Sequence, residues 1–176
     1  MNQPLDIKAL IGLGNPGQKY YHNRHNIGFQ ILDVMCERHN GSWQARDIME
    51  TAEITIGDKK IVLIKPQTFM NSSGKVIPFL NKKGIKPENI LVVHDELELP
   101  FGTVKIKVGG SAKGHNGLRS IIEQCGLEFA RLRFGIGRPA EREQVPDYVL
   151  QDFNENTAQL QDAIAKAVTA IEELFI

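Results

Sequence analysis

The sequence predicts an α/β fold, a single-domain twisted mixed β-sheet flanked by helices on both faces. Two observations predict it. Segments rich in β-branched residues alternate along the chain with segments whose apolar residues recur at helical spacing. One strand-like segment, ENILVVHD, is apolar without alternation, which is typical of a strand buried on both faces. No repeat or linker divides residues 1–176, a length that suffices for one domain with its own core.

The first half of the chain predicts a strand, a helix, a hairpin of two strands and a second helix. Residues 8–13 form a first strand, and residues 25–39 have the apolar spacing of a helix. Two β-rich runs at 52–57 and 59–66 meet at a Gly-Asp pair, which indicates a hairpin. The Asn-Ser-Ser sequence that follows can cap a helix over residues 71–83.

The second half continues the alternation of strands and helices. After the apolar strand at 88–95, residues 103–108 alternate as a strand, and a helix is expected over residues 118–125. Residues 131–137 form another alternating strand. Residues 155–175 carry one apolar stripe, which predicts a helix packed on the core.

Composition excludes several classes of protein. Hydrophobic residues make up 41% and charged residues 24% of the chain, as in an ordinary globular protein. No apolar run is long enough to span a membrane and no secretion signal begins the chain, so we expect a cytoplasmic protein without membrane association. Cys36 and Cys125 lie in apolar helical patterns and are expected to be free thiols.

The formal net charge is zero, but the charges are unevenly distributed. Residues 100–140 carry seven basic and two acidic side chains, whereas residues 141–176 carry two basic and eight acidic ones. The basic stretch allows two interpretations: a positive surface that meets phosphates, or an ordinary solvated face.

The segment IGLGNPGQKYYHNRHN raises the question of a dinucleotide-binding fingerprint. Such a fingerprint needs a helix that begins at the glycine turn, but Pro16 disfavours helix there and the next expected helix starts near residue 25. No strand ending in an acidic residue follows at the required distance. The glycines are therefore interpreted as a tight loop that follows the first strand.

Polar residues follow the expected strands at comparable positions. Ligands of open α/β sheets gather outside the carboxyl ends of the strands. Asn15, Asn71, Asp95 and Asn116 occupy such positions, and His25 begins the first helix. A histidine oriented by an aspartate can deprotonate water, and amide groups can stabilise an oxyanion. This combination suits hydrolysis of an acyl bond without a protein nucleophile.

Each of these residues also has a structural interpretation. An asparagine in a turn often closes that turn, Asp95 could cap a helix or pair with Lys65, and His25 could simply begin a helix. A metal site built from His22, His25, His94 and Asp95 is conceivable, although HExxH spacing and a cysteine cluster are absent. A serine nucleophile would need a GxSxG elbow, which the sequence lacks.

Several ordered motifs resemble a known family. They are GLGNPGxxYxxxRHNxGF, KPxTFMNxSG, HDELxLPxGxxKxKxGG, GHNGL and RLRxGIGRP, and they span about residues 8–150. The chain resembles bacterial-type peptidyl-tRNA hydrolase. The resemblance implies a monomeric α/β enzyme that cleaves the ester between a peptide and tRNA, with no cofactor and no metal.

The resemblance also assigns roles to residues. His25 would be the general base and Asp95 its orienting partner, and Asn15, Asn71 and Asn116 would line the site.

Substrate contacts are implied in the same way. Tyr20 would contact the tRNA 3′ end, and Phe69 and Met70 would line the peptide groove. Lys107 and Arg133 would clamp a phosphate at the tRNA 5′ end.

Two basic neighbours of the proposed phosphate clamp, Lys105 and Arg131, would be auxiliary at best.

The chain departs from the family where Lys113 replaces a glycine of the GGSAGGHNG turn. If this position needs a positive φ, Lys113 is strained; otherwise it extends the phosphate-binding surface. The stretch before RLR also looks shorter than in many members, which leaves the local shape near Arg131 open.

Two alternative functions remain: a catalytically idle RNA-binding module and a nucleotide-dependent oxidoreductase. Retention of His25, Asp95 and the three asparagines disfavours the first.

Overall fold

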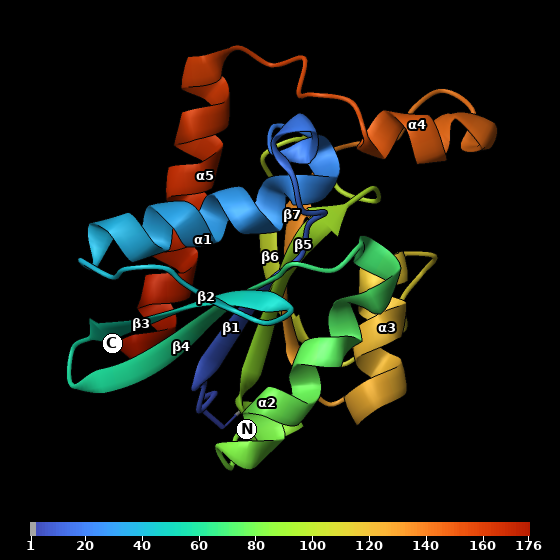
Figure 1. The fold of residues 1–176 in the computed structure, drawn as a ribbon. Coiled ribbons are helices and arrows are strands. Elements are labelled where there is room, and N and C mark those ends of the chain that lie inside the picture. Colours follow the sequence, from blue (N-terminus) through green and yellow to red (C-terminus); the bar gives the residue numbers. More distant parts are fainter. Residues whose placement is uncertain (1–2) are drawn as a thin grey trace.

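Seven strands form one mixed sheet in the computed structural model, which describes residues 3–176 (Figure 1). Their order across the sheet is β2-β3-β4-β1-β5-β7-β6. The strands are β1 (Ala9–Gly12), β2 (Gln44–Arg46), β3 (Met49–Ile56), β4 (Lys59–Pro66), β5 (Ile90–Glu96), β6 (Val104–Val108) and β7 (Ala130–Gly135).

The four central strands β4, β1, β5 and β7 run parallel. Their flanking strands β3 and β6 run antiparallel to them, and the edge strand β2 pairs antiparallel with β3. The carboxyl ends of the parallel strands therefore meet at one edge of the sheet. The predicted hairpin is confirmed, because β3 pairs with β4 from Met49↔Pro66 to Ile56↔Lys59.

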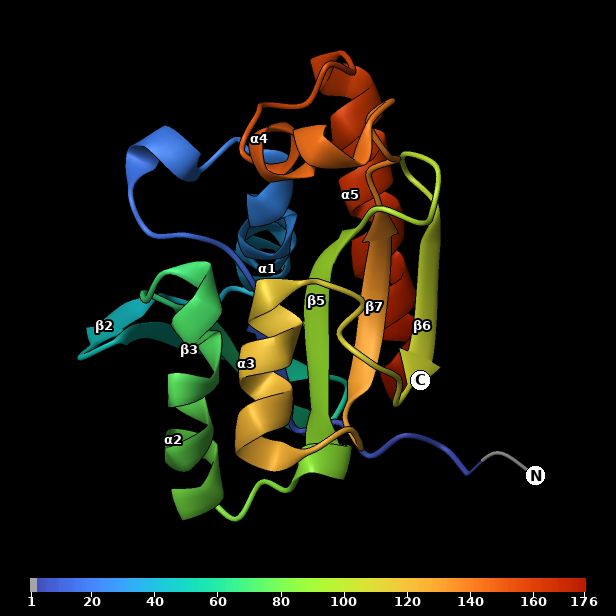
Figure 2. The same ribbon diagram turned by 90° about the vertical axis from the view of Figure 1, so that its right-hand side faces the viewer.

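Helices cover both faces of the sheet, as predicted (Figures 1 and 2). One face packs against α1 and α5, and the other packs against α2 and α3. The helices are α1 (Ile27–Arg38), α2 (Ile77–Lys82), α3 (Asn116–Cys125), α4 (Val145–Val149) and α5 (Thr157–Glu172). Short 3₁₀ helices include η1 (Gln18–Tyr20), η2 (Arg24–Asn26) and η3 (Met70–Val76).

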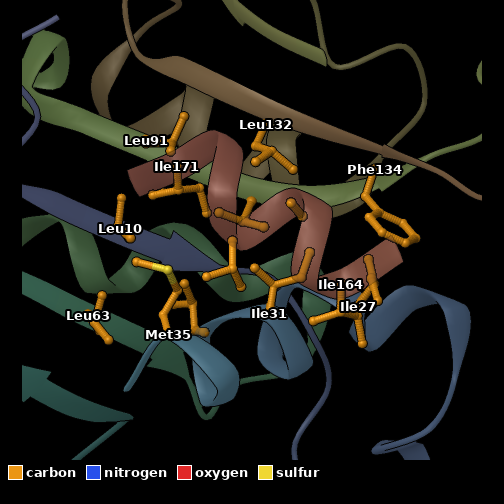
Figure 3. Close-up of a cluster of buried hydrophobic side chains, with 14 of the residues drawn as sticks. Leu10, Ile27, Ile31, Met35, Leu63, Leu91, Leu132, Phe134, Ile164 and Ile171 are labelled. Carbon is orange, nitrogen blue, oxygen red and sulfur yellow. The ribbon is translucent and has the colours of Figure 1, made fainter. Parts of the chain in front are cut away.

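Alternation along the strands divides the core into two clusters. Leu10 and Leu91 face α1 and α5, whereas their neighbours Ile11 and Val92 face α2 and α3. Figure 3 shows the first cluster, in which Leu10, Leu63 and Leu91 from the sheet meet residues of the two helices.

Two glycines bring α1 directly onto the end of the sheet. A Cβ atom on Gly28 would lie 2.4 Å from the Leu13 nitrogen and 2.5 Å from the Val93 oxygen. A Cβ atom on Gly12 would lie 2.5 Å from the Gly28 oxygen. No side chain fits at these distances, so the glycines let the start of α1 sit on the carboxyl ends of β1 and β5.

The predicted helix over residues 71–83 is wrong in its first half. This half is the 3₁₀ helix η3, which begins at Met70, and no side chain caps it. The Ser73 hydroxyl donates to the Met70 carbonyl at 2.7 Å, a local bond that competes with regular helix. Asn71 therefore does not serve as a cap and remains exposed.

Other elements were not predicted because they are short. Strand β2 has three residues and α4 has five, too few for a periodic pattern. The first helix was predicted from residue 25, but its first turn is the 3₁₀ helix η2 and α1 begins at Ile27. Within residues 3–176, every helix is too short or too polar to cross a membrane.

Candidate active site

Asp95 binds two imidazoles at the carboxyl end of β5. His25 Nδ1 lies 2.8 Å from Asp95 Oδ2, and His115 Nε2 lies 2.7 Å from Asp95 Oδ1. The Asp95 side chain is 2% exposed, and the two histidine side chains are 11% and 10% exposed. Each carboxylate oxygen is thus occupied by a histidine from a different segment of the chain.

The start of α3 fixes the tautomer of His115. His115 is the N-cap of α3, and its Nδ1 accepts hydrogen bonds from the backbone amides of Gly117 and Leu118 at 3.1 and 3.3 Å. A nitrogen that accepts carries no proton, so the proton of His115 is on Nε2 and is donated to Asp95.

His25 has the complementary arrangement. Asp95 accepts the Nδ1 proton, which leaves the lone pair on His25 Nε2, an atom with no partner within the described part of the chain. Burial lowers the pKa of His25, but the charge and hydrogen bond of Asp95 outweigh it and leave the pKa above its ordinary value of 6.5. His25 is therefore an oriented base with one free nitrogen.

The same contacts keep Asp95 ionised. Burial favours the neutral acid, but attraction and hydrogen bonds from His25 and His115 hold the pKa of Asp95 well below its ordinary value. The alternative in which Asp95 pairs with Lys65 is wrong, because Lys65 binds Asp33 and Glu50.

Asn15 is held in place by Asn26 and Met70. The Asn26 side chain accepts from the Asn15 amide at 2.9 Å and donates to the Asn15 carbonyl at 2.8 Å. The Met70 amide donates to Asn15 Oδ1 at 2.7 Å. The Nδ2 group of Asn15 has no acceptor among residues 3–176, so it is the donor that remains available.

A cleft of about 520 Å³ opens beside this cluster. Predicted site residues that line it are His25, Asp95, Lys107, Asn116 and Arg133. The glycine-rich loop between β6 and α3 forms one wall, and α4 with the 3₁₀ helix before it forms another.

The cleft also gathers possible metal ligands. The side chains of His25, Asp95 and His115 bring potential ligand atoms within 4.8 Å of one another. Both oxygens of Asp95 are already hydrogen-bonded, one to each histidine. Of the other two histidines considered for a metal site, His94 donates from Nδ1 to the Asp95 carbonyl at 2.8 Å, and burial lowers its pKa to about 4. His22 is exposed and packs edge-on against Tyr21.

Comparison with known proteins decides the family. The family model for peptidyl-tRNA hydrolase matches residues 9–176. The chain belongs to the peptidyl-tRNA hydrolase family. It is 46% identical over 162 residues to the peptidyl-tRNA hydrolase of Rubrobacter xylanophilus, covering 92% of this chain and 90% of that one. The enzyme of Neisseria meningitidis serogroup A is 44% identical over 173 residues, covering 96% and 90%.

Solved structures of peptidyl-tRNA hydrolases superpose closely. One in complex with N-propanol has a TM-score of 0.90 at 34% identity, covering 99% of this chain and 91% of that one. The Acinetobacter baumannii enzyme has a TM-score of 0.87 at 34% identity, covering 98% and 88%. The protein is therefore an enzyme that releases tRNA from peptidyl-tRNA, as the sequence motifs predict.

The residues that line the cleft do not include five other predicted site residues of the hydrolase: Asn15, Tyr20, Phe69, Met70 and Asn71. Phe69 is 60% exposed, and its ring packs edge-on against Tyr20 with centroids 6.4 Å apart. Asn71 is exposed in the first turn of η3. Met70 is 5% exposed, so the backbone amide that binds Asn15 is its clearest contribution to the site.

The basic residues of the hydrolase differ in how they are engaged. Arg133 Nε donates to Glu96 Oε1 at 2.8 Å. Arg131 is 1% exposed and donates to the carbonyls of Gly110 and Ser111, so it holds the glycine-rich loop in place. Strand β6 runs antiparallel to β7 and therefore ends away from the catalytic edge of the sheet, so the loop after it must return to that edge. By holding this loop, Arg131 helps to place Asn116 at the site.

Four cations of the cleft have no carboxylate partner among residues 3–176: Lys107, Lys113, Arg131 and Arg142. Burial and repulsion from Lys113, Arg133 and Arg131 lower the pKa of Lys107. Lys113 has φ 46°, so this position does adopt the left-handed conformation and its lysine is strained.

Sequence reasoning missed His115 and Asn26. Both stand next to a predicted residue in a quoted motif, GHNG or RHN. The helix expected over residues 118–125 begins at Asn116 in the structure, so the predicted start did not mark His115 as its N-cap.

Proposed function

We propose that His25 Nε2 acts as the general base in hydrolysis of the peptide–tRNA ester. The arrangement of His25, Asp95 and His115 at the cleft supports this role, because it leaves one imidazole nitrogen able to take a proton. Water attacks the ester carbon while its proton moves to His25 Nε2. The ester C–O bond then breaks, the ribose oxygen takes the proton from His25 Nε2 and leaves as the hydroxyl of free tRNA, and the peptide leaves with a carboxyl group.

Three amide side chains complete the proposed site. Asn15 offers a fixed Nδ2 donor, and Asn116 is exposed and lines the cleft. Asn71 is exposed directly after Met70, whose amide binds Asn15. Each can donate to the peptide carbonyls, the attacking water or the developing oxyanion. Tyr20 would contact the tRNA 3′ end, and Phe69 with Met70 would border the peptide groove.

The reaction is tested with N-acyl-aminoacyl-tRNA as substrate. Purified protein is expected to release tRNA at the same rate with and without EDTA, since the proposed base needs no metal. The measurement is the rate of ester cleavage. Loss of turnover in EDTA, restored by a divalent cation, would contradict the metal-independent mechanism.

Lys107 and Arg133 are proposed to hold a tRNA phosphate. Lys107 is free to do so, whereas Arg133 must exchange Glu96 for the phosphate. Phosphate contacts release counterions, so affinity depends on salt but little on sequence. Lys105 is exposed and does not line the cleft, and Arg131 is bonded to the loop, which agrees with auxiliary roles for both.

The double variant Lys107→Ala with Arg133→Ala is expected to bind tRNA more weakly. The slope of log affinity against log salt should fall by up to about 2, because each lost cation removes about one unit. Lys105→Ala is the matched control and should leave the slope nearly unchanged. An unchanged slope in the double variant would exclude these two residues from phosphate binding.

We also propose that residues 1–176 act as one domain, as a monomer and in the cytoplasm. One continuous sheet supports the first point, and the location follows from a substrate made during translation.

A further inference from the structure

The 3₁₀ helix η2 is held at each of its three residues by a different part of the chain. His25 binds Asp95 at the end of β5, and Asn26 binds Asn15 in the loop after β1. The roles of these two follow from the catalytic cluster. Arg24 points elsewhere, and the hydrolytic mechanism gives it no function.

Arg24 is a buried cation with specific partners. It is 2% exposed, and its Nη1 donates to the Tyr148 carbonyl at 2.9 Å and to Gln151 Oε1 at 3.3 Å. Its guanidinium carbon lies 3.8 Å from the centre of the Tyr148 ring. Its backbone amide donates to the Gln151 carbonyl at 3.0 Å. The Nη1 hydrogen bonds and the stack on the Tyr148 ring fix the guanidinium, whereas its buried Nε has no partner among residues 3–176.

Arg24 contacts α4, the helix that forms one wall of the cleft. Val145, Pro146 and Val149 of α4 line the cleft together with His25. Tyr148, on the same helix, also donates its hydroxyl to the carbonyl of Ile136 at 2.6 Å, just after β7. Figure 2 shows α4 beside the segment that precedes α1.

A second contact strengthens this attachment. Asn23 donates from Nδ2 to Asp152 Oδ1 at 2.9 Å, and the two residues form a β-bridge. Residues 23 and 24 are therefore fastened to the segment at 148–152 directly before the proposed base.

We propose that Arg24 is a positioning residue, which couples the placement of the α4 wall to the orientation of His25. With Arg24 stacked on Tyr148, η2 cannot rotate, and His25 Nε2 keeps its direction toward the cleft. Arg24 itself touches no substrate, because it is buried on the far side of the turn. This inference rests on the proposed role of His25 as the base.

Three variants test the coupling. Arg24→Lys keeps the charge but loses the planar stack, and Tyr148→Leu removes the ring while the backbone carbonyl stays. Both are expected to lower kcat by about 10- to 100-fold, since small misplacement of a catalytic group costs this much. KM should change by less than about threefold, because the binding surface is retained. Asp147→Asn, at an exposed residue of the same helix whose side chain has no bonding partner among residues 3–176, is the matched control, with near-normal kcat.

Rates are expressed per folded enzyme, with folding followed by circular dichroism and thermal unfolding. Tyr148→Leu carries the test if Arg24→Lys fails to fold. Unchanged kcat in the folded variants would overturn the proposal, as would a rise in KM at constant kcat. His25→Ala separates the two ideas: if it is active, the proposed base is wrong, whereas an inactive His25→Ala beside a normal Arg24→Lys refutes only the coupling.

Discussion

Replacing His25 by alanine is expected to lower kcat by about 10²- to 10⁴-fold, the usual contribution of a general base. Affinity for tRNA should stay close to that of the unchanged enzyme, because the proposed phosphate contacts are made by Lys107 and Arg133 and not by His25. The measurement is single-turnover cleavage of N-acyl-aminoacyl-tRNA together with a tRNA binding titration.

His22→Ala provides the control for this experiment. His22 lies three residues away, is exposed and packs on Tyr21 rather than on the catalytic cluster. It should retain near-normal turnover. Near-normal turnover in His25→Ala would exclude His25 as the base.

Asp95→Asn is expected to reduce kcat nearly as much as loss of His25, by about 10²- to 10⁴-fold. An asparagine has one accepting and one donating atom, whereas Asp95 accepts from both histidines. The α3 amides fix His115 as a donor, so the asparagine oxygen must face His115. Its NH2 group then faces His25 Nδ1 and imposes the tautomer whose Nε2 carries a proton.

The pH profile provides a second measurement on Asp95→Asn. Neutral His25 is the active form, so the rate of the unchanged enzyme should fall as pH drops through a pKa above 6.5. Without the Asp95 charge, burial dominates and lowers the pKa of His25. The residual activity should therefore decline at a lower pH, measured as kcat between about pH 5 and pH 8. If the rate of Asp95→Asn falls at the same pH as the rate of the unchanged enzyme, Asp95 does not set the pKa of His25.

The fold class and much of the candidate site were predictable because they depend on local patterns. The apolar run of β5 indicates a strand buried on both faces, and parallel strands bring their carboxyl ends together. Asp95 and Asn15 were predicted from these positions. His25 was predicted from the start of the helix that follows.

The remaining features depend on contacts between distant residues. Arg133 bonds to Glu96, 37 residues away, and Arg131 bonds to the loop carbonyls, 20 and 21 residues away. Neither contact leaves a periodic signal. His115 acquires its role only when the loop from β6 folds back and places the start of α3 beside Asp95.

The pairing of β6 with β7 has a consequence for how the enzyme behaves in solution. Lys105 stands opposite Arg133 and Lys107 opposite Arg131, so like charges face each other across the last strand of the sheet. Charged side chains on an exposed edge strand discourage its pairing with another sheet. The cations at this edge, two of which are proposed to hold a tRNA phosphate, thus also discourage edge-to-edge aggregation of the chain.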